Sequence, residues 1–363
     1  MPRLGLTDVS TSAAAAVGVA GYADTLGIGP CRQVVVLLVD GLGWNQLQAR
    51  PDLAPVLTAM SAVPIDASFP TTTPVGLGSF GTGLLPGAHG LVGASFWLPE
   101  SEAILSPLHW GNDPLPVAVQ PEPTVFEVVA RSGVTTSTVS PAAYADSGLT
   151  RAVLRGPVYR AADDVDDRIR EVSAILARGG ASFTYVYWPE LDRVGHEFGV
   201  DSEQWRAALV RVDELVARLA EALPPGAALV VTADHGMVDC PADLRIQVDD
   251  DRRLMDGVRH LAGEPRARHV YVRPGAAHDV CEAWRTVLGD RATVMSRVEV
   301  EMSGLMGDVE PALAGRLGDV MAVANGPVML ASRVDAKVSQ LLGQHGALTD
   351  DEVRIPAVIH RVP

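Results

Sequence analysis

Short, almost continuous apolar runs alternate along this chain with longer segments in which apolar and polar residues recur at helical spacing. The apolar runs are rich in β-branched residues, which is typical of strands buried on both faces of a parallel sheet. We predict such strands at 34–39, 135–139, 182–187 and 227–232, and helices at 124–131, 163–178 and 202–222. This alternation predicts an α/β fold, a doubly wound, mostly parallel sheet flanked by helices.

Two stretches depart from the alternation. Residues 96–123 are rich in Pro, Trp and Leu without clean periodicity, and we predict an insertion that lies near the functional site. Residues 241–320 predict a small α+β insertion, in which we expect the elements 269–272 (strand), 278–288 (helix) and 293–300 (strand). The chain then returns to the core with the segments 319–324, 328–331 and 344–346 and a last strand at 357–360, so we expect a single domain over 1–363.

Composition and charge narrow the function classes. The net charge of −15 argues against a nucleic-acid polymer or a membrane surface as partner, and it would repel an anionic substrate unless metal cations reverse the local field. Cys31, Cys240 and Cys281 form no CxxC pair, so neither a disulfide framework nor a zinc ribbon is indicated. Because the alanine stretch at 12–20 lacks a basic start, we expect no signal peptide and a cytoplasmic protein.

Carboxylates and imidazoles gather where the predicted strands end. Since ligands bind at the carboxyl ends of strands in open α/β sheets, these side chains are expected to share one site. Their oxygen and nitrogen atoms suit zinc, and the set is large enough for two metal ions that share a phosphate. The candidates are Asp40, Asp192, His196, Asp234, His235 and His345.

Simpler interpretations exist for each candidate. Asp40-Gly41 is also a turn sequence, and Asp192 with His196 would form an exposed ion pair one helical turn apart. The joint position of all six at successive strand ends favours the metal site. The remaining histidines lack such a partner and are expected to be structural or on the surface: His89, His109, His260, His269, His278 and His360.

Thr73 is the candidate nucleophile. Thr73-Pro74 fits a helix N-cap followed by proline at the first helical position, so a purely structural role is the alternative. A helix N-terminus also binds anions, and a hydroxyl bound there to a metal loses its proton more easily. The nearby GxGxxG match at 76–81 does not follow a strand, and we interpret its glycines as close packing of the helix behind Thr73.

Taken in order along the chain, these segments resemble the alkaline phosphatase superfamily, specifically its type I phosphodiesterase/nucleotide pyrophosphatase family. The similar segments are 34–41, 69–90 (a PTxT…TG…P…HG pattern), 191–196, 232–236 and 345–346. The resemblance implies an alkaline phosphatase-like fold and a hydrolase that cleaves phosphodiester or phosphoanhydride bonds of small-molecule substrates through a threonine nucleophile. It selects Thr73 for this role, with Thr72 as the fallback.

The resemblance also implies two divalent metal ions. Asp192, His196 and His345 would hold one, and Asp40, Asp234, His235 and Thr73 the other. The imidazoles favour zinc, with manganese as the alternative.

One position departs from the family pattern. Ala94 stands where these enzymes usually carry an asparagine that helps to bind a phosphoryl oxygen. A phosphomonoesterase or phosphonate hydrolase, or a catalytically silent metal-binding module, therefore remains an alternative. Phe96, Trp97 and Trp110 would either stack on a base or anchor the insertion to the core.

Overall fold

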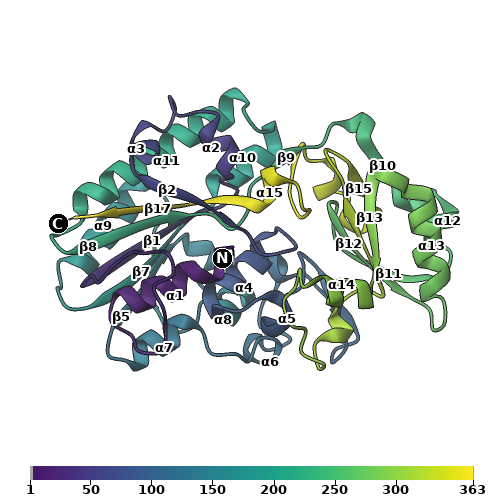
Figure 1. Cartoon of the computed structure of the whole chain (residues 1–363), viewed down its shortest axis with the longest axis horizontal. Helices are drawn as coiled ribbons and strands as arrows, with labels where there is room; N and C mark the ends of the chain where they lie inside the picture. The colour runs from purple at the N-terminus through teal and green to yellow at the C-terminus, as the bar shows by residue number, and fades with distance from the viewer. Residues whose placement is uncertain (1–2, 363) are drawn as a thin grey trace.

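The computed structural model describes residues 3–362 and contains a large sheet with helices on both faces and a smaller sheet to one side (Figure 1). The large sheet has seven strands in the order β2-β17-β8-β1-β7-β5-β6. Strands β8, β1, β7, β5 and β6 are parallel to one another, and β17 is antiparallel to both of its neighbours. The predicted α/β class with a mostly parallel sheet is confirmed.

Five of the seven strands of the large sheet follow the predicted apolar runs closely, and the two edge strands β2 and β6 were not predicted. Their bounds are β1 (Gln33–Val39), β2 (Ser61–Asp66), β5 (Thr135–Ser140), β6 (Val158–Ala161), β7 (Ser182–Trp188), β8 (Ala227–Thr232) and β17 (Arg354–Arg361). Every residue of β1, β7 and β8 is buried. These three strands lie side by side in the centre of the sheet, so the residues that follow them meet at one edge.

Helices cover both faces of the large sheet (Figure 1). One face carries α3 (Pro55–Ala59), α9 (Val165–Leu176), α10 (Glu190–Phe198) and α11 (Glu203–Ala222). The other carries α1 (Thr7–Ala16), α4 (Thr73–Thr82), α7 (Val125–Arg131) and α8 (Gly148–Val153). Within residues 3–362, none of the helices has the length and apolar character needed to span a bilayer.

The smaller sheet has four antiparallel strands in the order β11-β12-β14-β13, with β11 at the edge. Its elements are β11 (Val258–Glu264), β12 (Ala267–Val272), β13 (Ala292–Ser296), β14 (Val320–Ala324), α12 (Arg252–Met255), α13 (Ala277–Leu288) and α14 (Arg297–Ser303). Trp284 of α13 is fully buried in a core separate from that of the large sheet.

The strand predicted at 293–300 is partly wrong. The strand ends at Ser296, whose side chain accepts a hydrogen bond from the backbone of Glu299, and a helix follows. The Glu299 carboxylate accepts in return from the Ser296 backbone, at 2.7 Å. This capping box stabilises a helix start inside a run of β-branched residues.

The remaining elements are short. Helices α2 (Trp44–Gln48), α5 (Pro86–His89), α6 (Pro116–Val119) and α15 (Asp350–Val353) lie in the connections. The short strands are β3 (Phe96–Leu98), β4 (Ala103–Leu105), β9 (Val238–Asp239), β10 (Arg245–Gln247), β15 (Met329–Ala331) and β16 (Gly343–Gln344).

A buried ion pair joins the smaller sheet to the main body. Arg266, in the turn between β11 and β12, donates to both carboxylate oxygens of Glu352 in α15, at 3.0 and 2.7 Å. Both side chains are fully buried. Glu352 also accepts from the backbone N–H of Ala347, two residues after His345. The pair therefore fixes the smaller sheet against the loop that carries His345.

We expect the substitution Glu352→Gln to lower the free energy of unfolding by about 3–5 kcal/mol, because it leaves the buried Arg266 guanidinium without a counter-charge. Urea unfolding followed by circular dichroism measures this. The matched control is Glu221→Gln on the exposed face of α11, with an expected change within about 0.5 kcal/mol. Equal effects of the two substitutions would contradict the role given to the ion pair.

Candidate active site

The carboxyl ends of β1, β7 and β8 bring five of the predicted ligands together. Asp40 directly follows β1, and Asp234 and His235 follow β8. Helix α10 begins just after β7 and carries Asp192 and His196 one turn apart. The sixth predicted ligand, His345, directly follows β16 and is far in sequence from the other five.

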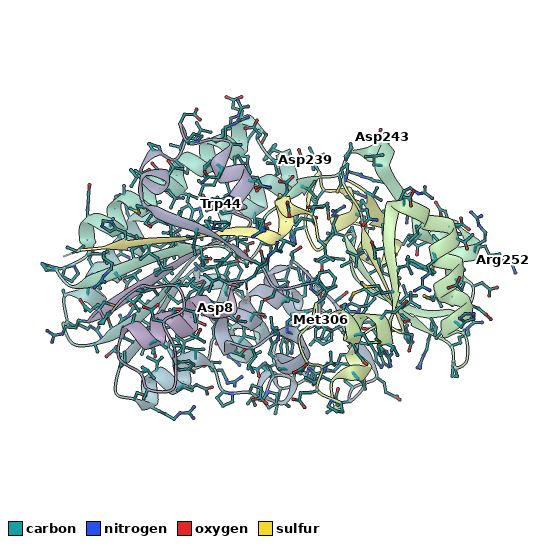
Figure 2. The ribbon with its side chains drawn as sticks, viewed as in Figure 1. Asp8, Trp44, Asp239, Asp243, Arg252 and Met306 are labelled. Atoms are coloured by element: carbon teal, nitrogen blue, oxygen red, sulfur yellow. The ribbon has the colours of Figure 1, made fainter. Side chains whose placement is uncertain are left out.

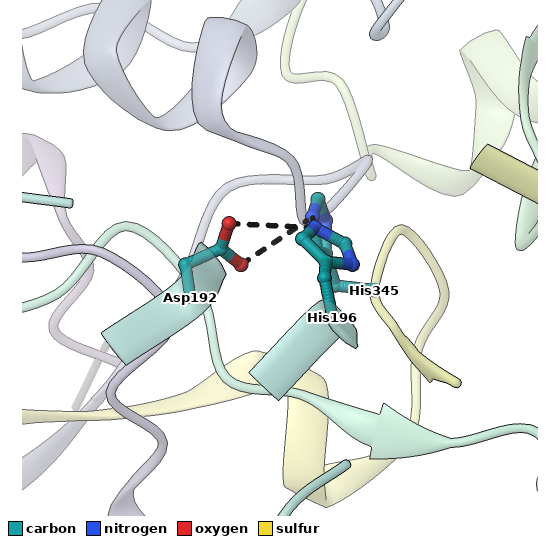
Figure 3. Close-up of side chains that lie close together, drawn as sticks. All are labelled: Asp192, His196 and His345. Atoms are coloured by element: carbon teal, nitrogen blue, oxygen red, sulfur yellow. Dashed lines mark hydrogen bonds and ion pairs between the residues drawn. The ribbon is translucent and has the colours of Figure 1, made fainter. Parts of the chain in front are cut away.

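Asp192, His196 and His345 form the first group. Nε2 of His196 lies 3.3 Å from Oδ2 of Asp192, and Nε2 of His345 lies 3.8 Å from Oδ1 of the same carboxylate. Figure 3 shows the side chain of His345 beside the two residues of α10. One ligand atom from each of the three lies within 4.8 Å of the others, which is close enough to hold a metal ion.

Asp40, Asp234 and His235 form the second group. Nε2 of His235 lies 3.4 Å from Oδ1 of Asp40 and 3.6 Å from Oδ2 of Asp234, and all three side chains are buried. The rings of His235 and His345 stack with their centroids 3.7 Å apart. The two groups therefore lie side by side.

Backbone carbonyls fix the tautomers of the three imidazoles. Nδ1 of His196, His235 and His345 lies within 3.0 Å of the carbonyl oxygens of Gly343, Gly236 and Thr71, respectively. Because a carbonyl can only accept, each Nδ1 carries a proton and each Nε2 of a neutral ring has a free lone pair. Nε2 of His345 and Nε2 of His196 face each other at 3.2 Å, an arrangement that a cation between them would stabilise.

The pKa values of the carboxylates also indicate a site that positive charge would stabilise. Burial, together with Asp234 and Asp192, raises the pKa of Asp40 well above its usual range, and burial raises the pKa of Asp234. Oδ1 of Asp192 and Oδ2 of Asp234 are buried without a hydrogen-bond partner. Burial and the neighbouring His235 and His196 lower the pKa of His345 well below its usual range, which favours the neutral form that binds metals.

Thr73 lies beside the second group. Its Oγ1 is 3.3 Å from Nε2 of His235 and 3.5 Å from each carboxylate oxygen of Asp40. The predicted N-cap is displaced by one residue, because Thr72 has the extended backbone of the cap and Thr73 is the first residue of α4. The Thr73 hydroxyl is therefore directed at the acidic group and not at the helix end. Tyr187 donates a hydrogen bond to the other side of Asp40.

The glycines of the GxGxxG match pack closely, as the sequence predicts. A Cβ on Gly76 would lie 2.6 Å from Cβ of Asp234, and one on Gly78 would lie 2.6 Å from the ring of His89. Gly81 contacts the backbone of Val153. The absence of side chains at these positions lets α4 approach the strand ends and brings Thr73 to the two groups.

A cleft of about 950 Å³ opens from the first group toward the smaller sheet. Its inner end is lined by Thr72, Ala94, Asp192, His196, Glu264 and His345. Its outer part includes His109 and His260, two histidines that sequence reasoning left as structural or on the surface. The periodicity of their own segments does not indicate this position, because the cleft is lined by segments far apart in the sequence.

Glu264 is a site residue that the sequence did not indicate. Its side chain is 4% exposed, and burial raises its pKa to about 8, against a lowering contribution from a hydrogen bond with Thr72. Oε2 lies 3.9 Å from Nδ1 of His345, and Oε1 has no hydrogen-bond partner. A carboxyl of β11 thus lines the same cleft as Ala94, where the resemblance leads us to expect a phosphate-binding asparagine.

The aromatic residues of the first insertion do not line the cleft. Phe96 and Trp110 are buried, and Trp110 donates its indole N–H to the carbonyl of Pro114. Trp97 stacks against His260. Of the two roles considered for them, these contacts support anchoring. His89 and His269 are also packed inside the fold, where burial lowers their pKa values to about 3 and about 4.

Comparison with known proteins agrees with this geometry. The family model described as type I phosphodiesterase / nucleotide pyrophosphatase matches residues 34–348. Human bis(5'-adenosyl)-triphosphatase ENPP4 is 27% identical over 99 residues, which make up 25% of this chain and 22% of that protein. The chain thus matches about a fifth of the length of this curated relative.

Solved structures share the fold. Murine ectonucleotide pyrophosphatase/phosphodiesterase 5 is similar over 90% of this chain and 88% of its own, with a TM-score of 0.73 and 21% identity. An inactive variant of that murine protein is in complex with AMP. Phosphonoacetate hydrolase from Sinorhizobium meliloti, in complex with phosphonoformate, is similar over 92% and 91% of the chains, with a TM-score of 0.70 and 19% identity.

We expect Gly76→Ala to destabilise the protein by about 1–3 kcal/mol, because the added methyl group would press on Asp234. Alanine is intrinsically the better helix former by about 1 kcal/mol, so a loss of stability would be diagnostic of the close approach. Urea unfolding measures the effect. A Cβ on Gly111 meets nothing within 4 Å, so Gly111→Ala is the control. A stability equal to or above that of the wild type would contradict this packing.

Proposed function

The chain belongs to the type I phosphodiesterase / nucleotide pyrophosphatase family, and on this basis we propose that it is a metal-dependent hydrolase of phosphodiester or phosphoanhydride bonds in small molecules. The observation that carries the proposal is the position of the Thr73 hydroxyl, within 3.5 Å of Asp40 and His235 and next to a second ligand group. A nucleophile flanked by two cation-binding groups is the arrangement that phosphoryl transfer requires.

The residues present fit two divalent ions. Asp192, His196 and His345 would hold one, and Asp40, Asp234, His235 and Thr73 the other. Three observations support this assignment. The imidazoles have free Nε2 lone pairs, one oxygen each of Asp192 and Asp234 has no hydrogen-bond partner, and the pKa values of Asp40 and Asp234 are raised. The mixed imidazole and carboxylate set favours zinc and accommodates manganese. Bound ions would neutralise charge on the phosphoryl oxygens and lower the pKa of the Thr73 hydroxyl.

Thr73 attacks phosphorus in the proposed reaction. Its hydroxyl gives its proton to solvent water, the Oγ1–P bond forms, and the bond from phosphorus to the leaving oxygen breaks, so that the leaving group departs with the electron pair and takes up a proton from water. A water molecule then cleaves the phosphothreonine and restores the hydroxyl. Asp40 holds the Thr73 side chain toward the site, and Tyr187 holds Asp40 through its hydrogen bond. Positioning and charge neutralisation supply most of the rate enhancement.

A phosphonate or phosphomonoester hydrolase is the second candidate, and Ala94 favours it. An alanine cannot donate a hydrogen bond to a phosphoryl oxygen, so the substrate phosphate is oriented by other groups at the inner end of the cleft. Glu264 and Thr72 lie there. The relative turnover of a diester and a monoester separates the two candidates.

We expect the wild type to hydrolyse bis(4-nitrophenyl) phosphate faster than 4-nitrophenyl phosphate, and Thr73→Ala to lower kcat for the diester by about 10³-fold or more. Thr72→Ala, which removes a group at the inner end of the cleft, is expected to lower kcat much less than Thr73→Ala does. The matched control is Thr286→Ala on the exposed face of α13, which should keep full activity. The release of nitrophenol measures both. Loss of activity in Thr72→Ala with retention in Thr73→Ala would reverse the nucleophile assignment, and monoester preference would favour the second candidate.

Removal of metal should abolish turnover without unfolding the chain. Dialysis against a chelator is expected to reduce activity at least about 100-fold, and added zinc or manganese should restore it. We expect His345→Ala to bind one equivalent of zinc less than the wild type by elemental analysis, while His278→Ala, a substitution on the outside of the smaller sheet, binds as much as the wild type. Full activity of the chelated protein would overturn the metal-dependent mechanism.

A further inference from the structure

Two positively charged side chains at the outer part of the cleft have no acidic partner. Arg259 and Lys337 both line the cleft, and within residues 3–362 neither forms a salt bridge. The chain has a net charge of −15, and Lys337 is its only lysine. Unpaired cations in so acidic a protein create a local positive field beside the metal-ligand groups.

The acidic groups nearby are already used by the protein itself. Asp335 pairs with the buried Arg268 at 2.5 Å and accepts from Ser339 at 2.9 Å. Asp249 accepts from the side chains of Gln247 and Ser332 and from the backbone N–H of Arg333. Neither carboxylate forms an ion pair with Arg259 or Lys337, so both cations remain available to a ligand.

Trp97 packs against Arg259 and His260 at the outer part of the cleft. The guanidinium of Arg259 lies 5.3 Å from the centroid of the Trp97 ring, and the ring of His260 stacks on Trp97 at 4.7 Å. Nε2 of His260 is buried without a hydrogen-bond partner. A register shift in β11 between Val258 and His260 directs these neighbouring side chains, and such irregularities re-aim side chains at binding sites.

The space between the metal-ligand groups and these cations is apolar. It is lined by Val258, Leu261, Val338, Leu341, Ile104 and Leu108. No Phe, Tyr or Trp of the described residues lines the cleft, so outside the metal-ligand groups a nucleobase has only the smaller imidazole rings of His109 and His260 to stack on. Strand β11 runs from Glu264, beside His345, to Arg259, roughly 16 Å along the strand. The long Arg259 side chain can reach back over part of that distance.

The geometry points to a second anion-binding subsite, formed by Arg259, His260 and Lys337, for a terminal phosphate or carboxylate on the substrate. Its substrates are phosphate esters whose organic group is an aliphatic chain ending in a negative charge, on the order of 10 Å from the reacting phosphorus. The apolar middle of the cleft holds the chain and the outer cations hold its end. This inference rests on the proposed function for the inner end of the cleft.

Turnover of matched diesters tests the subsite. The 4-nitrophenyl phosphodiester of 6-hydroxyhexanoate ends in a carboxylate, and its primary amide has the same length without charge. We expect the wild type to have a KM about tenfold lower for the carboxylate than for the amide. In Arg259→Gln and Lys337→Met, the ratio of the KM for the amide to the KM for the carboxylate should fall toward one. The KM of a diester that carries a terminal phosphate on the same chain shows whether the subsite prefers phosphate or carboxylate.

The control is Arg252→Gln, an exposed arginine of α12 that does not line the cleft and lies at the outer end of the smaller sheet (Figure 2). It should keep the full preference for the charged substrate. An equal KM for carboxylate and amide in the wild type, or an equal loss of preference in Arg252→Gln, would overturn the subsite.

A second readout does not depend on turnover. Because Lys337 is the only lysine, modification by trinitrobenzenesulfonate can be assigned to it by peptide mass. We expect 6-phosphonohexanoate to slow this modification about tenfold and hexylphosphonate, which lacks the terminal carboxylate, to leave it unchanged. Protection without hydrolysis of any diester would retain the subsite and reject the proposed function. Hydrolysis of the diesters with no protection of Lys337 and no preference for the carboxylate substrate would retain the proposed function and reject the subsite.

Discussion

The crowding of three carboxylates at the buried ends of neighbouring strands is the constraint on which the rest of the site depends. Asp40, Asp192 and Asp234 lie close enough that the other two help to raise the pKa of Asp40, on top of the effect of burial. Like charges this close are stable only if protons or cations neutralise them. The neighbouring imidazoles are turned so that their free nitrogens face the same space. Carboxylates and imidazoles together thus form a site prepared for cations.

The central sheet makes this arrangement rigid enough for catalysis. Strands β8, β1 and β7 are buried along their whole length, so their ends are fixed relative to one another. Helix α4 brings Thr73 to the same place, and it can do so because Gly76 presents no side chain to Asp234. The Thr73 hydroxyl is therefore positioned by packing as well as by its own hydrogen bonds. A precise position is what a reaction dominated by electrostatics and orientation needs.

In the proposed function, the smaller sheet supplies the groups that select the substrate. Its edge strand β11 supplies Glu264 at the inner end of the cleft and Arg259 at the outer end. The buried pair of Arg266 and Glu352 ties this strand to the loop that carries His345. The groups proposed for phosphoryl transfer thus lie at the main sheet, and the smaller sheet adds the groups proposed to contact the rest of the substrate. Family members can in this way share a reaction and differ in substrate.

The sequence determined the elements whose signals are local. Continuous apolar runs identified β1, β7 and β8, and Asp40, Asp192, His196, Asp234 and His235 stood out because they follow such runs. The start of α4 was predicted one residue later than observed, and residues 297–300, predicted as strand, form a helix. Both differences show the limit of local signals, since a cap can end a β-branched run. Only the tertiary structure revealed the cleft and the residues that line it, because Glu264, Arg259 and Lys337 belong to no recognisable sequence motif. Their chemistry arises from burial and from contacts between segments far apart in the chain.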